Sequence, residues 1–182
     1  MNLQTPRILW GSLLTSNALY AGVLVYLNAS SPARSALTPQ ASLAPAFALV
    51  ALGLAAASVL LPRALYAGAA RALAPETRDD VKDDPLGATQ GFRRPASSER
   101  VFVDPGAARR LAMQAFQTPF ILGMAMAESV SLLGFVLGFL GFGLAVVAPF
   151  FAVGVALQAA RFPTRARIEL PFEQATGARF RD

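Results

Sequence analysis

The chain has 182 residues, a length that suits one compact domain. Apolar residues make up 54% of it and charged residues only 15%, against a usual charged share of about 25%. The sequence contains no cysteine and no histidine, which excludes disulfides, zinc and haem sites built on those residues, a catalytic cysteine and a Ser-His-Asp triad. We expect no metal and no cofactor.

Charge is distributed in clusters between long apolar blocks. The net charge of +5 fits the positive-inside bias of membrane proteins. The basic residues flank the apolar blocks and are not interleaved with aromatic residues, so we expect no nucleic-acid partner.

The first apolar block runs from Ile8 to Leu27 and carries no charge. It is 20 residues long, enough to cross ~30 Å of hydrocarbon and longer than the apolar core of a usual signal peptide. We therefore predict a membrane helix near 8–27, followed by a short outer loop over 28–40.

The second apolar block begins at Leu43 and is interrupted by Pro62. Arg63 and Tyr66 suit the membrane interface, so the predicted helix covers 43–66. Over 71–107 the composition becomes charged and rich in proline and glycine, which predicts a solvated loop. The basic amphipathic run 105–117 is expected to lie on the membrane surface.

The last apolar block, 119–160, has 42 residues and one charge, Glu128. Since one helix needs only about 20 residues to span, this block predicts two helices, near 119–139 and 144–161, with a tight turn at 141–143. Residues 162–182 form a polar tail. On the last helix, four large apolar residues are expected to face lipid: Phe150, Phe151, Val153 and Val155.

Lysine and arginine counts predict the orientation. The segment 63–110 has nine of them and the tail from Arg161 has five, against one before the first helix and one in the first loop. The middle loop and both termini are therefore predicted to be cytoplasmic. The expected fold is an all-α integral membrane four-helix bundle, a single domain over 1–182 in the inner membrane, with two helical hairpins joined by a long cytoplasmic loop.

Small residues mark the expected helix-packing faces. On the third predicted helix they form one stripe and include a GxxxG: Gly123, Ala127, Gly134 and Gly138. We interpret the stripe as packing within the chain, with a homo-oligomer interface as the alternative.

Glu128 is the residue that points most directly to chemistry. It lies near mid-membrane, where a charged carboxylate costs at least a few kcal/mol, so it is expected to be neutral or to have polar partners. Asn17 and Ser16 on the first helix lie at a matching depth, and Ser131 is one turn away on the same helix. Two interpretations remain open: a proton- or ion-binding site, or a buried polar contact between helices.

The stretch MAMAESVSLLGFVLGFL, Met124 to Leu140, resembles the ion-carrying helix of the ATP synthase proteolipid, subunit c. In that family a carboxylate follows small residues and precedes an aliphatic run with a glycine. The resemblance implies that Glu128 is the ion-binding carboxylate. It also implies a hairpin whose loop is cytoplasmic, as predicted here for the second and third helices.

The sequence is compatible with three functions. The first is a non-catalytic accessory, assembly or structural subunit of a larger membrane complex, contacting the lipid bilayer and other membrane subunits. The alternative is a membrane protein that binds a proton or ion at Glu128. The third, disfavoured, is an enzyme with a metal-dependent site in the middle loop, whose acids lack the regular spacing of a calcium loop: Asp79, Asp80, Asp83 and Asp84.

Overall fold

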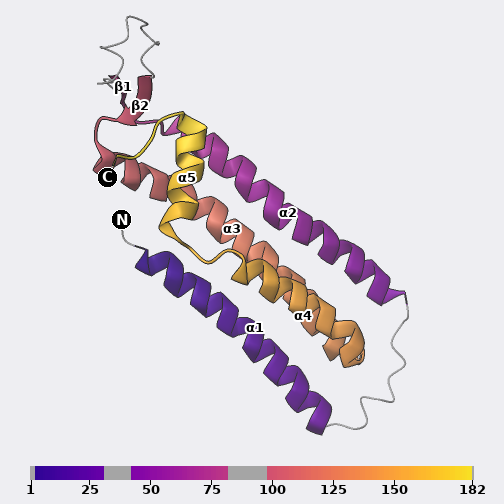
Figure 1. Ribbon diagram of the computed structural model, residues 1–182. Helices are drawn as coiled ribbons and strands as arrows, with labels where there is room; N and C mark the ends of the chain where they lie inside the picture. The colour runs from indigo at the N-terminus through magenta and orange to yellow at the C-terminus, as the bar shows by residue number, and fades with distance from the viewer. Residues whose placement is uncertain (1–2, 31–41, 82–97, 182) are drawn as a thin grey trace, which may run out of the picture. The chain divides into compact units, whose positions relative to one another are not determined.

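The computed structural model describes residues 3–30, 42–81 and 98–181. Over these ranges the chain forms five α-helices and one two-stranded antiparallel sheet (Figure 1). The elements in chain order are α1 (Gln4–Ser30), α2 (Leu43–Ala72), β1 (Thr77–Val81), β2 (Ser98–Phe102), α3 (Pro105–Phe139), α4 (Leu144–Ala159) and α5 (Arg165–Thr176). The predominantly helical fold class is confirmed, whereas the sequence does not predict β1, β2 or α5.

Three helices are long and apolar enough to cross a membrane: α1, α2 and α3, with 27, 30 and 35 residues. The fourth predicted span corresponds to α4, which is apolar but has only 16 residues. At 1.5 Å per residue it extends about 24 Å, less than the ~30 Å of a typical hydrocarbon core.

Two predicted helix boundaries are wrong. α2 continues past Pro62 as predicted but ends at Ala72 and not at residue 66, and α3 runs without a break through Pro119. The expected surface helix 105–117 and the span 119–139 are therefore one helix (Figure 1). Proline removes one backbone hydrogen bond from a helix, but packing around the helix can offset that loss.

The predicted turn between α3 and α4 is confirmed. Gly141 has φ 91°, a left-handed conformation that glycine adopts without steric cost. The Phe142 N–H donates to the Leu137 carbonyl at 3.1 Å and the Gly141 N–H donates to the Gly138 carbonyl at 3.2 Å. This pair of bonds is a Schellman motif, which satisfies the last carbonyls of α3 and reverses the chain.

The chain groups into two compact units, described separately below. The span unit comprises Asn2–Leu65 and Gln117–Pro163, and the loop-and-tail unit comprises Tyr66–Phe116 and Thr164–Asp182. In the span unit, one apolar cluster joins α1, α2, α3, α4 and the turn before α4. Its buried members are Leu24, Ala51, Val130, Leu137, Phe142, Val147 and Phe150.

The expectation that four residues of α4 face lipid is only partly correct. Val153 and Val155 are exposed, Phe151 is half-buried, and Phe150 lies in the core. A Cβ on Gly134 would come within 2.6 Å of the Phe150 Cβ, so the glycine makes room for this ring against α3. Because α4 is apolar all round, its sequence alone does not indicate which side is buried.

In the loop-and-tail unit, β1 pairs with β2 from Thr77 opposite Phe102 to Val81 opposite Ser98. Arg179 adds a parallel bridge to Val101, and its carbonyl accepts from the Phe102 N–H at 3.3 Å. Three aromatic rings pack beside this bridge, with centroids 4.7 to 6.1 Å apart. They are Phe102, Phe172 and Phe180.

Helix α5 is held in this unit at both ends and along one side. The Thr164 hydroxyl accepts from the Arg167 N–H at its start, and Gly177, with φ 72°, ends it. Ile168 and Phe172 are its buried residues, and the Tyr66 hydroxyl donates to the Ile168 carbonyl at 2.6 Å. The predicted tail is therefore a folded segment over its described residues.

Candidate functional site

Glu128 lies on α3, half-buried, with its carboxyl group directed to α1. The Ser16 hydroxyl is 2.6 Å from Glu128 Oε1, and the Tyr20 hydroxyl is 3.2 Å from the same atom. Ser16 and Tyr20 are four residues apart and so lie on one face of α1. The Tyr20 ring also packs against Phe135 of α3, with centroids 5.5 Å apart.

Asn17 is buried, and its side chain forms a hydrogen bond with α4 and not with Glu128. Its Nδ2 donates to the Leu13 carbonyl at 3.1 Å and to Gln158 Oε1 at 2.8 Å. The Trp10 Nε1–H donates to the Gln158 backbone carbonyl at 2.8 Å, and the Trp10 ring packs edge-on against Phe162. Gln158 is thus the residue of α4 that α1 contacts twice through hydrogen bonds.

Ser131 is fully buried between α3 and α4. A Cβ on Gly154 would lie 2.0 Å from the Ser131 hydroxyl oxygen and 3.0 Å from the Ala127 carbonyl. The hydroxyl therefore occupies the space that a side chain at position 154 would take. Of the four polar residues expected to form one site, the structure brings Ser16 to Glu128 and Asn17 to Gln158, and it places Ser131 against Gly154.

A second polar contact in the span unit joins Arg161 to α2. Pro62 has no N–H, so the Ser58 carbonyl four residues earlier lacks its helical partner. Arg161 Nη2 donates to that carbonyl at 2.6 Å and to the Ser58 hydroxyl oxygen at 3.0 Å. A Cβ on Gly123 would come within 3.0 Å of Pro62 Cγ and 3.2 Å of Arg161 Nε, so glycine permits this approach.

The predicted packing residues of α3 contact other helices of the same chain. Besides Gly123, Gly134 lies against Phe150 of α4, and a Cβ on Gly138 would be 2.8 Å from the Leu24 methyl carbons of α1. Ala127 is fully buried. This stripe is therefore used within the chain.

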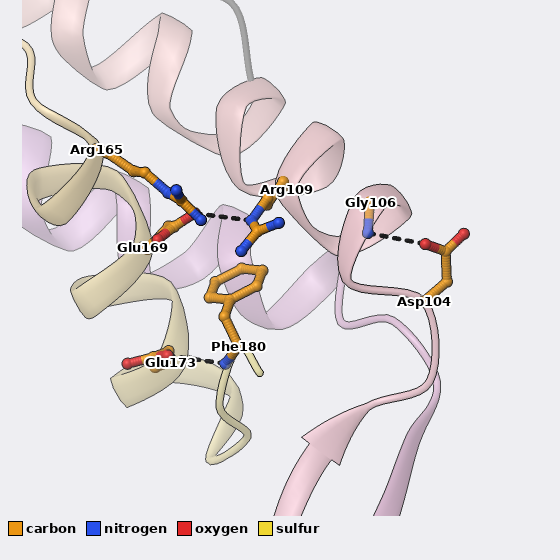
Figure 2. Close-up of polar contacts among 7 residues, drawn as sticks. All are labelled: Asp104, Gly106, Arg109, Arg165, Glu169, Glu173 and Phe180. Carbon is orange, nitrogen blue, oxygen red and sulfur yellow. Dashed lines mark hydrogen bonds and ion pairs between the residues drawn. The ribbon is translucent and has the colours of Figure 1, made fainter. Parts of the chain in front are cut away.

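The loop-and-tail unit contains a polar cluster around Glu169 (Figure 2). Glu169 Oε1 accepts from Arg109 Nε at 3.0 Å and from Arg165 Nε at 2.8 Å. Figure 2 shows Phe180 beside Arg109. The guanidinium carbon of Arg109 lies 5.6 Å from the centroid of the Phe180 ring, within the limit of about 6 Å for a cation–π pair. These contacts connect α3 to α5 and the C-terminal segment.

Asp104 caps the start of α3 in the same unit (Figure 2). Its Oδ1 accepts from the Gly106 N–H at 2.8 Å and the Ala107 N–H at 2.9 Å. The pKa of this exposed carboxyl is lowered, mainly by the Ala107 backbone hydrogen bond, with further lowering by the Gly106 bond and the nearby Arg110 charge. These contacts are those of a helix N-cap.

The acidic residues of the middle loop that the structure describes do not form a metal site. Asp79 is exposed, and its carboxylate lies 3.7 Å from Arg100. Asp80 pairs through its backbone with Glu99. Asp83 and Asp84 lie outside the described residues. In the described part of the chain, no group of three or more acidic residues is placed to hold a metal ion.

Sequence reasoning missed three participants: Tyr20, Gln158 and the Ser58–Arg161 contact. Gln158 did carry a signal, since it is a polar side chain near the end of an apolar block. In the sequence, Tyr20 looks like any aromatic residue on the apolar face of a helix. The Ser58 acceptor is a backbone carbonyl, which every residue has, so the sequence does not single it out. Compared with models of protein families, with curated proteins and with solved structures, the chain has no match.

Proposed function

We propose that the chain is a non-catalytic accessory or assembly subunit of a larger inner-membrane complex, in which Glu128 links two helices. The observation that supports this most is the pair of hydroxyl contacts from α1 to the Glu128 carboxyl. Interhelical hydrogen bonds in membranes average roughly 0.6 kcal/mol. Two such bonds on one face of α1 fit a structural contact that fixes the rotation of α1 against α3.

The proposed arrangement in the membrane has four spans and cytoplasmic termini. The short helix α4 completes a hairpin with α3 through the Schellman turn. The excess of lysine and arginine in the middle loop and the tail supports a cytoplasmic location for both. With an even number of spans, the N-terminus shares that side.

The outward surfaces of α1 and α2 suit lipid and other membrane subunits. Both helices expose many large apolar side chains, among them Leu19, Val25, Leu49, Leu52 and Leu60. Since the small-residue stripe of α3 packs within the chain, a hetero-complex is favoured over a homo-oligomer built on that stripe.

Purification from native membranes in a mild detergent tests the accessory function. We expect a tagged chain to elute with a constant set of partner membrane proteins at fixed ratios, and in a particle larger than one chain. If the protein elutes from native membranes as a monomer without partners, the proposal fails.

A second function, proton binding at Glu128, is supported by one specific observation. The Ser16 hydroxyl has a single hydrogen but lies 2.7 Å from the Leu13 carbonyl and 2.6 Å from Glu128 Oε1. When that hydrogen is donated to Leu13, the short contact to Glu128 requires a hydrogen from the carboxyl group. When the carboxylate is ionised, Ser16 and Tyr20 can both donate to it. The contacts therefore accommodate both protonation states.

Carbodiimide labelling tests this second function, because the reagent requires a protonated carboxyl. If Glu128 exchanges protons, labelling at Glu128 should fall as the pH rises, and Glu128→Gln should abolish it. Labelling that does not change with pH, or no labelling in the wild type at any pH, would exclude a titrating carboxyl accessible to the reagent.

A further inference from the structure

Three buried side-chain atoms in the span unit have no hydrogen-bond partner among the described residues. They are Asn17 Oδ1, Ser131 Oγ and Gln158 Nε2. Asn17 is 2% exposed, and the other two residues are fully buried. Leaving a buried polar atom unbonded is energetically costly, so nearly all such atoms in proteins bond to protein or ordered water.

Two of these atoms belong to amide groups that are bonded to each other. Asn17 Nδ2 donates both to Gln158 Oε1 and to the Leu13 carbonyl. Turning the Asn17 amide over would place its oxygen against the Leu13 carbonyl oxygen, so the bond to Leu13 fixes the orientation of both amides. Asn17 therefore offers an acceptor, and Gln158 offers a donor, beside the bond that joins them.

The Ser131 hydroxyl lies where α3 contacts α4, beside Gly154. It occupies the position where a side chain on Gly154 would lie. Gly154 is one turn before Gln158, and residues four apart share a helix face with about 5–6 Å between their Cβ positions. Helical side chains lean toward the N-terminus of the helix, so the Gln158 side chain extends toward Gly154 and Ser131.

The chemistry of the three atoms restricts what they can bind. The N–H of Gln158 disfavours a cation, and the carbonyl oxygen of Asn17 disfavours an anion. The Ser131 hydroxyl can donate or accept. A small neutral molecule that both donates and accepts hydrogen bonds satisfies all three, and buried waters in proteins typically make about three hydrogen bonds.

We propose that one internal water molecule is bound at this junction, with Asn17, Ser131 and Gln158 as its ligands. It accepts from Gln158 Nε2, donates to Asn17 Oδ1 and completes its third bond with Ser131 Oγ. The site involves neither Glu128 nor its two hydroxyl partners, so it does not depend on the function proposed above. It makes the α1–α4 contact a hydrated polar junction.

Water-edited solid-state NMR of the isotopically labelled full chain in lipid vesicles tests the proposal, with water itself as the probe. We expect magnetisation from water to reach the Gln158 side-chain amide early, before the backbone amide of the buried Leu137 in the same unit. Early transfer should be lost in the double variant Asn17→Leu/Ser131→Ala. It should persist in Ser129→Ala, which removes a hydroxyl on the same helix that already bonds to the Ala125 carbonyl.

Two results would overturn the proposal. In the wild type, transfer to Gln158 no earlier than to Leu137 would mean that no water is bound there. Early transfer that is unchanged in the double variant would mean that these atoms are not the ligands. If the double variant does not assemble, the comparison of Gln158 with Leu137 in the wild type decides the question.

Discussion

Pro62 shows how a proline inside a helix can create a contact with a residue far away in the sequence, here Arg161. Pro62 deprives the Ser58 carbonyl of its helical N–H, and the Arg161 guanidinium supplies a donor at 2.6 Å. Hydrogen bonds that involve a charged group contribute about 1.5–3 kcal/mol, more than neutral ones. The contact thus offsets part of the cost of a proline inside α2.

This account predicts that Pro62 and Arg161 are energetically coupled. Arg161→Met should lower thermal stability in detergent by about 1–3 kcal/mol. In a Pro62→Ala background, which returns an N–H to the Ser58 carbonyl, the same substitution should cost about 1 kcal/mol less. A double-mutant cycle by thermal unfolding measures this difference, and additive effects of the two substitutions would contradict it.

The polar residues illustrate how far the sequence predicts the site. Charge and depth single out Glu128 and place Ser16 near it, because a mid-membrane carboxyl needs polar neighbours. Depth does not define the rotation of a helix about its axis. Asn17, the next residue after Ser16, therefore faces Gln158 of α4 and not Glu128, and no sequence pattern in an apolar block distinguishes these two outcomes.

At the scale of elements, the pairing of α3 with α4 depends on glycines that admit a neighbouring side chain. Gly154→Ala should destabilise the span unit by about 1–3 kcal/mol, because its Cβ would lie 2.0 Å from the Ser131 hydroxyl oxygen. Adding Ser131→Ala should recover part of that loss by removing the oxygen. The matched control is Gly53→Ala in α2, where no atom lies within 4 Å of the new Cβ. Equal effects of Gly154→Ala and Gly53→Ala on melting temperature would contradict this packing.

The start of α3 provides a prediction about pH. The pKa of Asp104 is lowered in the folded protein, chiefly by its bond from the Ala107 N–H. A carboxyl with a lowered folded pKa stabilises the fold above its unfolded pKa of about 3.9, and that stabilisation is lost as the pH falls through the folded value. Wild type should therefore be more stable than Asp104→Asn at neutral pH, and the two should converge in acid. A difference in melting temperature that stays constant with pH would contradict this.

The prediction errors have two physical causes. The sequence prediction separated the segments on either side of Pro119, following a rule that holds for isolated helices, yet α3 continues past this proline because packing can compensate for one lost bond. The β1–β2 sheet and α5 depend on contacts between Phe102, Phe172 and Phe180, and Phe102 is far from the other two in the chain. A prediction from local composition assigns such polar segments to loops, because it does not take into account the packing of aromatic residues that are distant in the sequence.

For the whole molecule, the proposed topology predicts which positions an external reagent reaches. The chain has no cysteine of its own, so a single cysteine introduced at an exposed position is the chain's only thiol, and its labelling shows which side of the membrane that position faces. In intact cells an impermeant thiol reagent should label Asn28→Cys in the last turn of α1, but should label Thr77→Cys and Gln174→Cys only after the membrane is opened. Labelling of Thr77→Cys in intact cells would overturn the orientation.

The central claim is that Glu128 holds helices together and does not carry protons. The most direct test compares Glu128→Gln with Glu128→Leu in the assembled protein, reconstituted into vesicles. Gln preserves the shape and much of the hydrogen bonding of a protonated Glu but cannot ionise. We expect Glu128→Gln to assemble with unchanged proton flux and nearly unchanged thermal stability, and Glu128→Leu to lose about 1 kcal/mol of stability. A loss of proton flux in Glu128→Gln with assembly intact would contradict the claim and favour the proton-binding function.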